Sequence, residues 1–154
     1  MLTKEETIKQ TQQHINNVEN KIELMICLLK DRAMNHDKSK LEEPELSIFQ
    51  EYTEKLKTST YGSDEYKSFL KEMQVALDHH YKNNRHHPEH FENGIDGMNL
   101  IDLVEMFCDW KAATERHDNG DIFKSIEFNT KRFNLNPQLV NILNNTAKLF
   151  LKEK

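Results

Sequence analysis

The stretch that decides the fold is NLIDLVEMFCDWKAATER, which spans residues 99–116. Its apolar residues recur at helical spacing around nearly the whole circumference, and such a helix is expected in the middle of a bundle. Asn99 is a suitable N-cap, and the helix is predicted to end near Arg116. Asp102 lies in the first turn, where the helix dipole favours a carboxylate, whereas Asp109 is expected to be carried into or beside the core.

Periodic apolar residues predict five further helices before and after this segment. The first is expected from about residue 4 to the low thirties, with one break allowed, and the others cover about 39–58, 63–80, 121–133 and 137–152. Thr3 with Glu6, and Ser39 with Glu42, fit capping boxes at two of these starts. Residues 82–98 hold one of the three prolines and two of the four glycines, so they are predicted to form a loop.

The composition also favours an all-α domain. The chain has 154 residues with only 4 glycines and 3 prolines, too few for the turns of a sandwich, a barrel or a doubly wound sheet. At this length one compact domain with its own core is expected. We therefore predict one helical domain over residues 1–154, a bundle of about six helices, in which the helices of 121–152 pack on a metal-site core at about 10–116.

The charge balance limits the partners and the location. There are 21 basic and 26 acidic residues, a net charge of −5, which argues against extended nucleic acid and anionic membrane surfaces. No run reaches the roughly eighteen apolar residues of a membrane span, and the N-terminus lacks the pattern of a secretory signal. We expect a cytoplasmic protein with no membrane partner. Cys27 and Cys108 lie in apolar helical stretches and are predicted to be small core residues.

Histidine is the unusual residue type. There are eight, and five of them fall between positions 79 and 90. His80 lies on the same helical stripe as Met73 and is expected to face inward, whereas His79 points to a different side. The loop that follows carries three more, and of His79, His86, His87 and His90 at most two are expected to be functional.

Several helices each offer inward-facing imidazole or carboxylate groups, the ligands that suit Mn, Fe, Co, Ni and Zn. His14 precedes Val18 by one turn on the inward face of the first helix. The adjacent pair His36-Asp37 cannot share one face of a regular helix, so it predicts a helix end. The full set of candidate ligands is His14, His36, Asp37, His80, His86, His87 and Asp109.

These residues resemble the pattern of the HD-domain metal-dependent phosphohydrolases: a histidine in the first helix, a His-Asp dyad, and a late Asp. His36-Asp37-Lys38-Ser39-Lys40 is similar to the dyad followed by a lysine, and Asp109-Trp110-Lys111-Ala112-Ala113 is similar to the final Asp segment. The resemblance spans about residues 10–116. The whole chain looks most like a small, largely uncharacterised group of HD-like proteins from bacteria and their phages.

The resemblance implies His14, His36, Asp37 and Asp109 as ligands of one metal ion. It also implies His80 with His87 or His86 as ligands of a second ion, bridged by Asp37. His86-His87-Pro88-Glu89 is similar to the paired-histidine segment of the cyclic-dinucleotide phosphodiesterase branch. The spacing from His80 is much shorter here, however, and Ile95-Asp96-Gly97-Met98 replaces that branch's Gly-Tyr-Pro signature, so that substrate is not predicted.

One or two such divalent ions would activate a water for attack on phosphorus. We expect a phosphohydrolase acting on a small phosphate ester, most plausibly a nucleotide. Besides Asp37, Lys40 and Glu89 are candidate catalytic residues, Glu89 as a proton shuttle, and Lys40, Arg85 and Lys111 are candidates for binding the phosphate.

Three other interpretations remain open. Histidine and carboxylate ligands at two irons also activate oxygen, as in a di-iron oxygenase on the HD scaffold. A phage or regulatory protein could keep the fold and bind a metal ion or a nucleotide without catalysis. Finally, the histidines of a helical scaffold could have no shared purpose.

Overall fold

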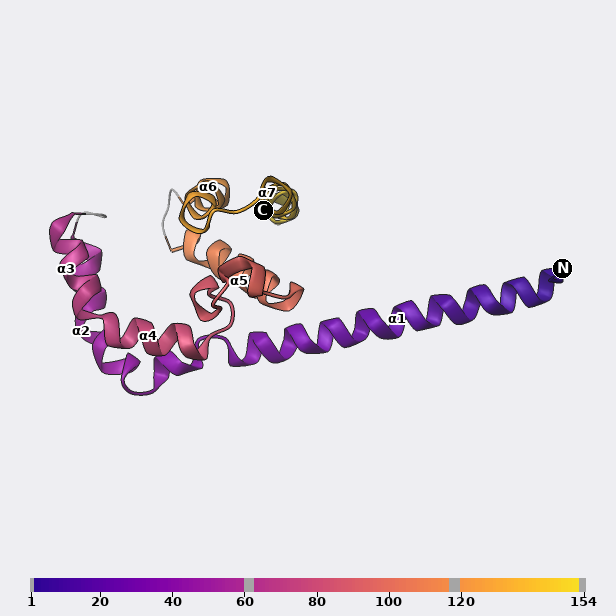
Figure 1. Cartoon of the computed structure of the whole chain (residues 1–154), viewed down its shortest axis with the longest axis horizontal. Helices are drawn as coiled ribbons and strands as arrows, with labels where there is room; N and C mark the ends of the chain where they lie inside the picture. Colours follow the sequence, from indigo (N-terminus) through magenta and orange to yellow (C-terminus); the bar gives the residue numbers. More distant parts are fainter. Residues whose placement is uncertain (1, 60–62, 117–119, 153–154) are drawn as a thin grey trace. The chain divides into compact units, whose positions relative to one another are not determined.

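The computed structural model describes residues 2–59, 63–116 and 120–152. Within these ranges the chain forms seven α-helices, four short 3-10 helices and no β-strand, which confirms the all-α prediction (Figure 1). The α-helices are α1 (Lys4–Asn35), α2 (Glu45–Thr58), α3 (Asp64–Glu72), α4 (Gln74–Asn83), α5 (Leu100–Thr114), α6 (Ile122–Phe133) and α7 (Pro137–Ala147). The 3-10 helices are η1 (Lys38–Leu41), η2 (Pro88–His90), η3 (Gly94–Gly97) and η4 (Lys148–Lys152).

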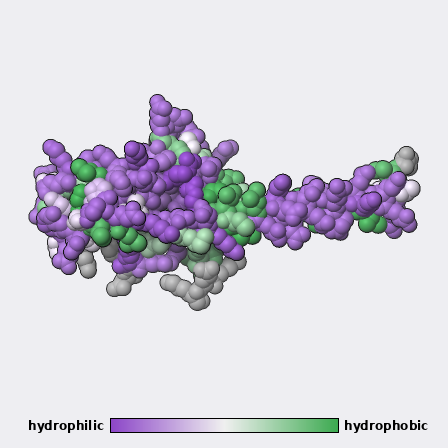
Figure 2. Space-filling model, turned by 90° about the horizontal axis from the view of Figure 1, so that it is seen from below, coloured by the Kyte–Doolittle hydropathy of each residue, from purple (hydrophilic) through white to green (hydrophobic). Residues whose placement is uncertain are grey.

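The chain divides into two compact units, unit 1 with residues 1–35 and unit 2 with residues 36–154. Unit 1 is the helix α1, which runs without a break for 32 residues. Its predicted capping box is confirmed: Thr3 N–H donates to Glu6 Oε2 at 2.8 Å, and Glu6 N–H donates to Thr3 Oγ1 at 3.2 Å. Hydrophilic residues cover most of the face shown in Figure 2, with hydrophobic patches between them. Among the described helices none is both long enough and apolar enough to cross a membrane.

Two element boundaries differ from the predictions. The helix expected over 63–80 is two helices, α3 and α4, which are separated at Met73, where ψ is 0°. The capping box expected at Ser39 is wrong, because Ser39 lies inside η1 and α2 begins only at Glu45. The Ser39 hydroxyl instead accepts a hydrogen bond from Asn84 Nδ2 at 2.7 Å, which ties η1 to the end of α4.

The core of unit 2 lies where α5, α6 and α7 meet. Its buried side chains are Phe107, Ile122, Ile126, Leu135, Leu143 and Ala147. The predicted starts of the last two helices are confirmed, since Asp121 Oδ1 accepts from Phe123 N–H at 2.8 Å and Asn136 Oδ1 accepts from Leu139 N–H at 2.9 Å. Each fully buried aliphatic side chain contributes about 1.5–3 kcal/mol. This cluster therefore anchors α5, the helix that carries Asp109.

Within unit 2, α5 is only partly buried. Ile101, Met106 and Phe107 are buried, whereas Leu100 is 67% exposed and Val104 is 42% exposed. The prediction of a helix covered nearly all round is therefore wrong for this unit. The physical reason is that α5 meets α6 and the core cluster through Phe107 and Trp110, which leaves Leu100 and Val104 uncovered within this unit.

Neither cysteine is a core residue of its unit. Cys27 is exposed on α1, and Cys108 is exposed on α5. Cys108 follows Val104 by one helical turn and so shares the exposed side of α5. The prediction that both are small core residues is wrong, and both are free thiols.

Candidate metal centre

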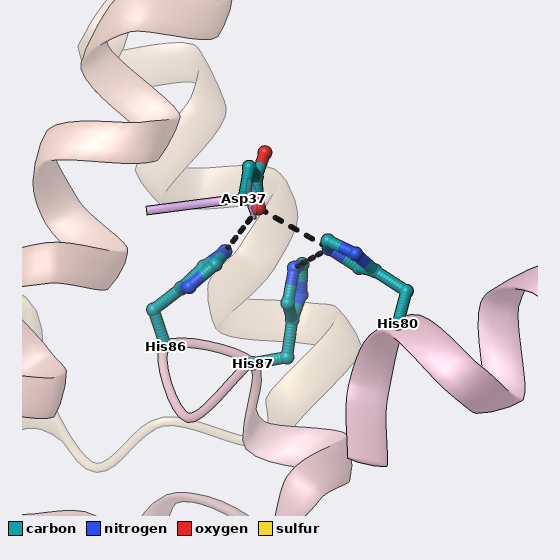
Figure 3. Close-up of side chains that lie close together, drawn as sticks. All are labelled: Asp37, His80, His86 and His87. Atoms are coloured by element: carbon teal, nitrogen blue, oxygen red, sulfur yellow. Dashed lines mark hydrogen bonds and ion pairs between the residues drawn. The ribbon is translucent and has the colours of Figure 1, made fainter. Parts of the chain in front are cut away.

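Four side chains of unit 2 converge on one point. Asp37 comes from the residue before η1, His80 from α4, and His86 and His87 from the segment between α4 and η2. One ligand atom of each lies within 4.8 Å of the others. Figure 3 shows the three imidazole rings approaching the Asp37 carboxylate from the side of α4 and the following loop.

Asp37 is placed by an uncommon backbone conformation. Its φ is 55° and its ψ is 17°, the left-handed region, where a non-glycine residue costs about 1–2 kcal/mol. The prediction that the pair His36-Asp37 marks a helix end is confirmed, because α1 stops at Asn35 and η1 begins at Lys38. The reversal at Asp37 lets both side chains reach the same region despite being adjacent in sequence.

The contacts around one oxygen of Asp37 are close but are not hydrogen bonds. Asp37 Oδ1 lies 3.4 Å from His80 Nε2 and 3.5 Å from His86 Nε2. His80 Nε2 in turn lies 2.9 Å from His87 Nε2. Two imidazole nitrogens therefore face Asp37 Oδ1, and the His87 ring joins them through a hydrogen bond with His80. The four residues lie close enough together to act as ligands of a shared cation.

A second group lies on the other side of the same carboxylate. His36, Asp37 and Asp109 also place one ligand atom each within 4.8 Å of one another. His36 Nε2 is 3.5 Å from Asp37 Oδ2 and 3.8 Å from Asp109 Oδ1. Asp37 thus belongs to both groups, with Oδ1 toward the first and Oδ2 toward the second.

Two glutamates, Glu45, which is buried, and Glu105, which is partly buried, lie behind the imidazoles. Glu45 Oε2 lies 2.8 Å from His80 Nδ1. Glu105 Oε1 lies 3.0 Å from His36 Nδ1 and 3.2 Å from His86 Nδ1. When Nδ1–H faces a carboxylate, the proton is fixed on Nδ1 and Nε2 keeps its lone pair, the arrangement found behind metal-binding histidines.

The neighbours of His80 agree with that assignment. Asn84 Nδ2 is 3.0 Å from His80 Nδ1, but its two hydrogens are used by Ser39 Oγ at 2.7 Å and by the His80 carbonyl at 2.9 Å. His80 Nδ1 is therefore free to donate to Glu45. Glu45 also faces His79 Nδ1 at 2.7 Å, so this glutamate, which is 0% exposed, serves both histidines.

Buried polar atoms support the fit of a metal ion. Asp37 Oδ1, His86 Nε2 and His86 Nδ1 are buried and have no hydrogen-bond partner among the described residues. His86 Nδ1 is near Glu105 but outside hydrogen-bond geometry. An unsatisfied buried polar group costs about 1–3 kcal/mol, more when it is charged. A divalent cation between Asp37 Oδ1 and the three Nε2 atoms would satisfy this oxygen and the His86 Nε2 together.

The electrostatics set the protonation states that ligands need. Burial acts to raise the pKa of Asp37, but the hydrogen bond and charge of Lys40 outweigh it, and the pKa lies below its usual value. Burial likewise acts to raise the pKa of Asp109, and the neighbouring histidines lower it. Burial lowers the pKa of His80 and lowers the pKa of His87 to about 3. These two imidazoles are therefore neutral near pH 7.

His36 is the exception among the imidazoles. The carboxylates of Asp109 and Glu105 raise the pKa of His36 to about 10. Without a metal ion this ring would carry the positive charge that balances the surrounding acids. A divalent ion bound at Asp37 and Asp109 would take over that role.

Other predicted site residues have local partners. Lys40 Nζ donates to Asp37 Oδ2 at 2.6 Å and borders the centre. Arg85 donates from Nε and Nη2 to the Asp102 carboxylate, at 3.1 and 3.0 Å, and so belongs to the start of α5. Glu89 Oε1 accepts from Arg132 Nη2 at 2.6 Å, and Lys111 pairs with Glu115. The structure brings Lys40 to the centre, whereas Arg85, Glu89 and Lys111 lie outside its ligand groups.

The structure places the remaining histidines in different surroundings. His80 is buried, as expected, and of the four histidines in question the ligand groups contain His86 and His87 but not His79 or His90. His90 Nδ1 donates to the Tyr81 carbonyl at 2.8 Å, a structural role. Asp102 serves the cap of α5, also as expected, since it exchanges hydrogen bonds with Asn99.

His14 lies in unit 1 and outside the groups of possible ligands that the described residues form, namely the two groups that share Asp37 and a third group of His36, His86 and Glu105. Helix α1 continues without a break from His14 to Asn35, a rise of about 32 Å at 1.5 Å per residue. A ligand role for His14 beside Asp37 of the same chain would require α1 to break. That role stays a prediction.

The sequence analysis missed Glu45 and Glu105. Glu105 precedes Asp109 by four residues, so helical spacing places both on one side of α5, and this signal could have identified it. Glu45 gives no such signal, because an acid in the first turn of a helix is common for dipole reasons alone. Its role depends on the packing of α2 against α4.

Comparison with known proteins gives a family and nothing further. No curated protein and no solved structure matches the chain. One family model matches residues 3–149, nearly the whole chain, and its description is "Family of unknown function (DUF5662)". The chain therefore belongs to the DUF5662 family.

Proposed function

We propose that the chain is a metal-dependent phosphohydrolase that acts on a small phosphate ester, a nucleotide being the substrate class we favour. The observation that carries the proposal is the pair of ligand groups that share Asp37, with His80 hydrogen-bonded to Glu45 and His36 to Glu105. Metal-binding histidines almost always have such a partner on the other ring nitrogen.

The two groups would hold one or two ions. Asp37 Oδ1 with His80, His86 and His87 offers one set of ligands, and Asp37 Oδ2 with His36 and Asp109 offers the other. Mixed imidazole and carboxylate ligands suit Mn, Fe, Co, Ni and Zn. Bound there, such an ion would lower the pKa of a coordinated water and neutralise charge on phosphoryl oxygens.

Lys40 is the residue best placed to contact a substrate phosphate. Its ammonium lies 2.6 Å from Asp37 Oδ2, and its side chain is 39% exposed. A partly exposed cation next to the ligand groups can pair with an anionic substrate without being buried unpaired. The resemblance to the HD dyad, in which a lysine follows His-Asp, supports the same assignment.

The first test is metal content. Untagged protein is reconstituted separately with Mn, Fe, Co, Ni and Zn, desalted, and analysed for bound metal, with Asp37→Asn and Asp78→Asn prepared in parallel. Asp78 is exposed on α4 and pairs only locally with Gln74, so its variant controls for the same chemical change on a site-bearing helix. We expect wild type and Asp78→Asn to retain one or two equivalents and Asp37→Asn to lose them. Equal metal content in all three would overturn the proposal.

The second test is turnover. Protein loaded with each metal is assayed against nucleoside mono-, di- and triphosphates and a generic phosphodiester by release of phosphate or alcohol. Hydrolysis that Asp37→Asn abolishes and Asp78→Asn keeps supports the proposal. Metal retention with no hydrolysis would overturn the catalytic part and leave a binding module, and oxygen uptake by the Fe(II) form would indicate an oxygenase instead.

A further inference from the structure

Helix α1 carries an apolar stripe that nothing within its own unit covers. None of its 32 residues is buried in unit 1. The stripe residues are Ile8, Ile15, Val18, Ile22, Met25 and Leu29. A helix gains most of its stability from packing of an apolar face, so a partner for this stripe is expected.

The spacing of the stripe identifies the kind of partner. The steps of seven, three, four, three and four residues are those of heptad positions a and d. A straight α-helix has 3.6 residues per turn, so a stripe with a 3.5-residue period moves round its surface by about 20° per heptad. Such a stripe keeps facing a partner helix only when the two helices supercoil. From Ile8 to Ile22 the apolar stripe is also narrow, as in a coiled coil. A helix that packs on a globular core has a wider apolar face.

We propose that α1 pairs in parallel with α1 of a second copy of this chain, as a two-stranded coiled coil through this stripe. Position a holds Ile8, Ile15, Ile22 and Leu29, and a β-branched residue at a beside a residue at d that is not β-branched, as at Ile22 and Met25, is typical of parallel two-stranded coiled coils. Val18 and Met25 occupy d. A shallow groove of about 320 Å³ along α1, lined by His14, Asn17, Val18, Lys21, Ile22 and Met25, provides the holes for the facing side chains.

Polar side chains beside the stripe favour the parallel orientation over the antiparallel register in which Val18 packs on Ile22 of the second copy. In a parallel pair, position g of one helix faces position e five residues later in the other, which sets His14 near Glu19 of the second copy. In an antiparallel pair in which the two α1 helices overlap along their whole length, Val18 would pack against Ile22 of the second copy. This pairing would then set Glu19 against Glu19 and Lys21 against Lys21, and like charges in contact are destabilising.

The ends of the stripe are also defined by the sequence. Thr11 and Arg32 occupy the outer d positions, so the continuous apolar layers run from Ile15 to Leu29. Ile26 and Leu28 flank the last two layers at positions e and g and widen the contact there. The parallel pair therefore brings both copies of unit 2 to the same end of the coiled coil.

Cysteine cross-linking of the full chain tests the proposal. In a Cys27→Ser, Cys108→Ser background, Met25→Cys places a thiol at d, and Asn20→Cys places one at the outward position f as the matched control. After mild oxidation we expect a disulfide-linked dimer for Met25→Cys and none for Asn20→Cys. Light scattering should give twice the chain mass of 18.3 kDa for the uncrosslinked protein.

Three outcomes would overturn it: a monomer by light scattering, equal cross-linking of the two variants, or cross-linking that requires mixing Ile15→Cys with Met25→Cys, as an antiparallel pair would. Ile15→Glu with Ile22→Glu should give a monomer whose metal content equals that of wild type. Metal content is read on the same samples, so failure of the coiled coil and failure of the metal centre are distinguished.

Discussion

Glu105 is the residue whose role is most open to a quantitative test. It faces the Nδ1 atoms of His36 and His86, with which it forms a group of possible ligands, and it belongs to neither of the two groups that share Asp37. Replacing a supporting group of this kind typically weakens metal affinity 10–100-fold, because the imidazoles lose their orientation and part of their basicity. Glu105→Gln should therefore weaken metal binding by roughly tenfold or more in a competition titration with a chelating dye.

The matched control is Glu115→Gln, the same change on an exposed residue of α5 that pairs with Lys111. Its affinity should equal that of wild type. The conservative variant Glu105→Asp keeps the charge but changes the position of the carboxylate. Its metal affinity should fall between that of wild type and that of Glu105→Gln. Unchanged affinity in Glu105→Gln would show that the histidines are not held from behind by this carboxylate.

The backbone of Asp37 permits a second residue-level prediction. With φ at 55°, any side chain with a Cβ carries strain there that glycine does not. Asp37→Gly and Asp37→Ala both remove the carboxylate. The difference between their free energies of unfolding therefore reports the backbone strain at this position. We expect the metal-free Gly variant to be more stable than the Ala variant by about 1 kcal/mol in urea unfolding. Equal stability would mean that the variant relaxes out of the left-handed conformation.

At the scale of elements, the start of α5 fixes where Glu105 and Asp109 point. Asn99 Oδ1 accepts from Ile101 N–H at 2.9 Å and from Asp102 N–H at 3.0 Å. Replacing an Asn cap by Ala costs about 1 kcal/mol, because the two amide hydrogens lose their acceptor. Asn99→Ala should lower the free energy of unfolding by about that amount in urea titrations.

Asn93→Ala is the matched control for the cap. Asn93 precedes η3, and its side chain makes no capping hydrogen bond there. The difference between the two variants is the contribution of the cap. A loss of equal size in both would assign the effect to the loop and not to the α5 cap.

The elements that the sequence predicted well are those with strong local signals. Thr3 and Asn99 cap helices as expected, because each acts within its own first turn. The split at Met73 and the 3-10 turn around Ser39 were not predicted, since both depend on contacts with other elements. Asn84, which bonds Ser39, is 45 residues away in sequence.

The same distinction applies to the site. His36, Asp37, His80, His86, His87 and Asp109 could be nominated because imidazole and carboxylate on inward faces are conspicuous. That they could meet was predictable because several helices each direct such a group inward, whereas their exact grouping depends on how the helices pack. Glu45 could not be found, because its value comes from lying behind His80 once α2 packs on α4. Arg85 shows the converse: its charge suggested a phosphate, but the buried Asp102 carboxylate accepts its guanidinium.

At the scale of the whole molecule, the metal centre should act as a cross-link within unit 2. Its candidate ligands come from four segments: the start of η1, α4, the loop after α4, and α5. The aromatic and aliphatic core holds α5 to α6 and α7 but does not include α2 or α4. A metal ion would therefore connect α4 and η1 to the part of unit 2 that has its own core.

An ion that binds only the folded chain stabilises it, by about 2.7 kcal/mol at 100 times the dissociation constant. For a chain of this size, that corresponds to a rise in melting temperature on the order of 5–10 °C. Calorimetry of metal-free wild type should show that rise when the metal it retains in the metal-content test is added back. EDTA should then reverse the rise. Asp37→Asn should show neither, because both ligand groups share this carboxylate. A rise of equal size in wild type and Asp37→Asn would place the stabilising ion elsewhere on the chain.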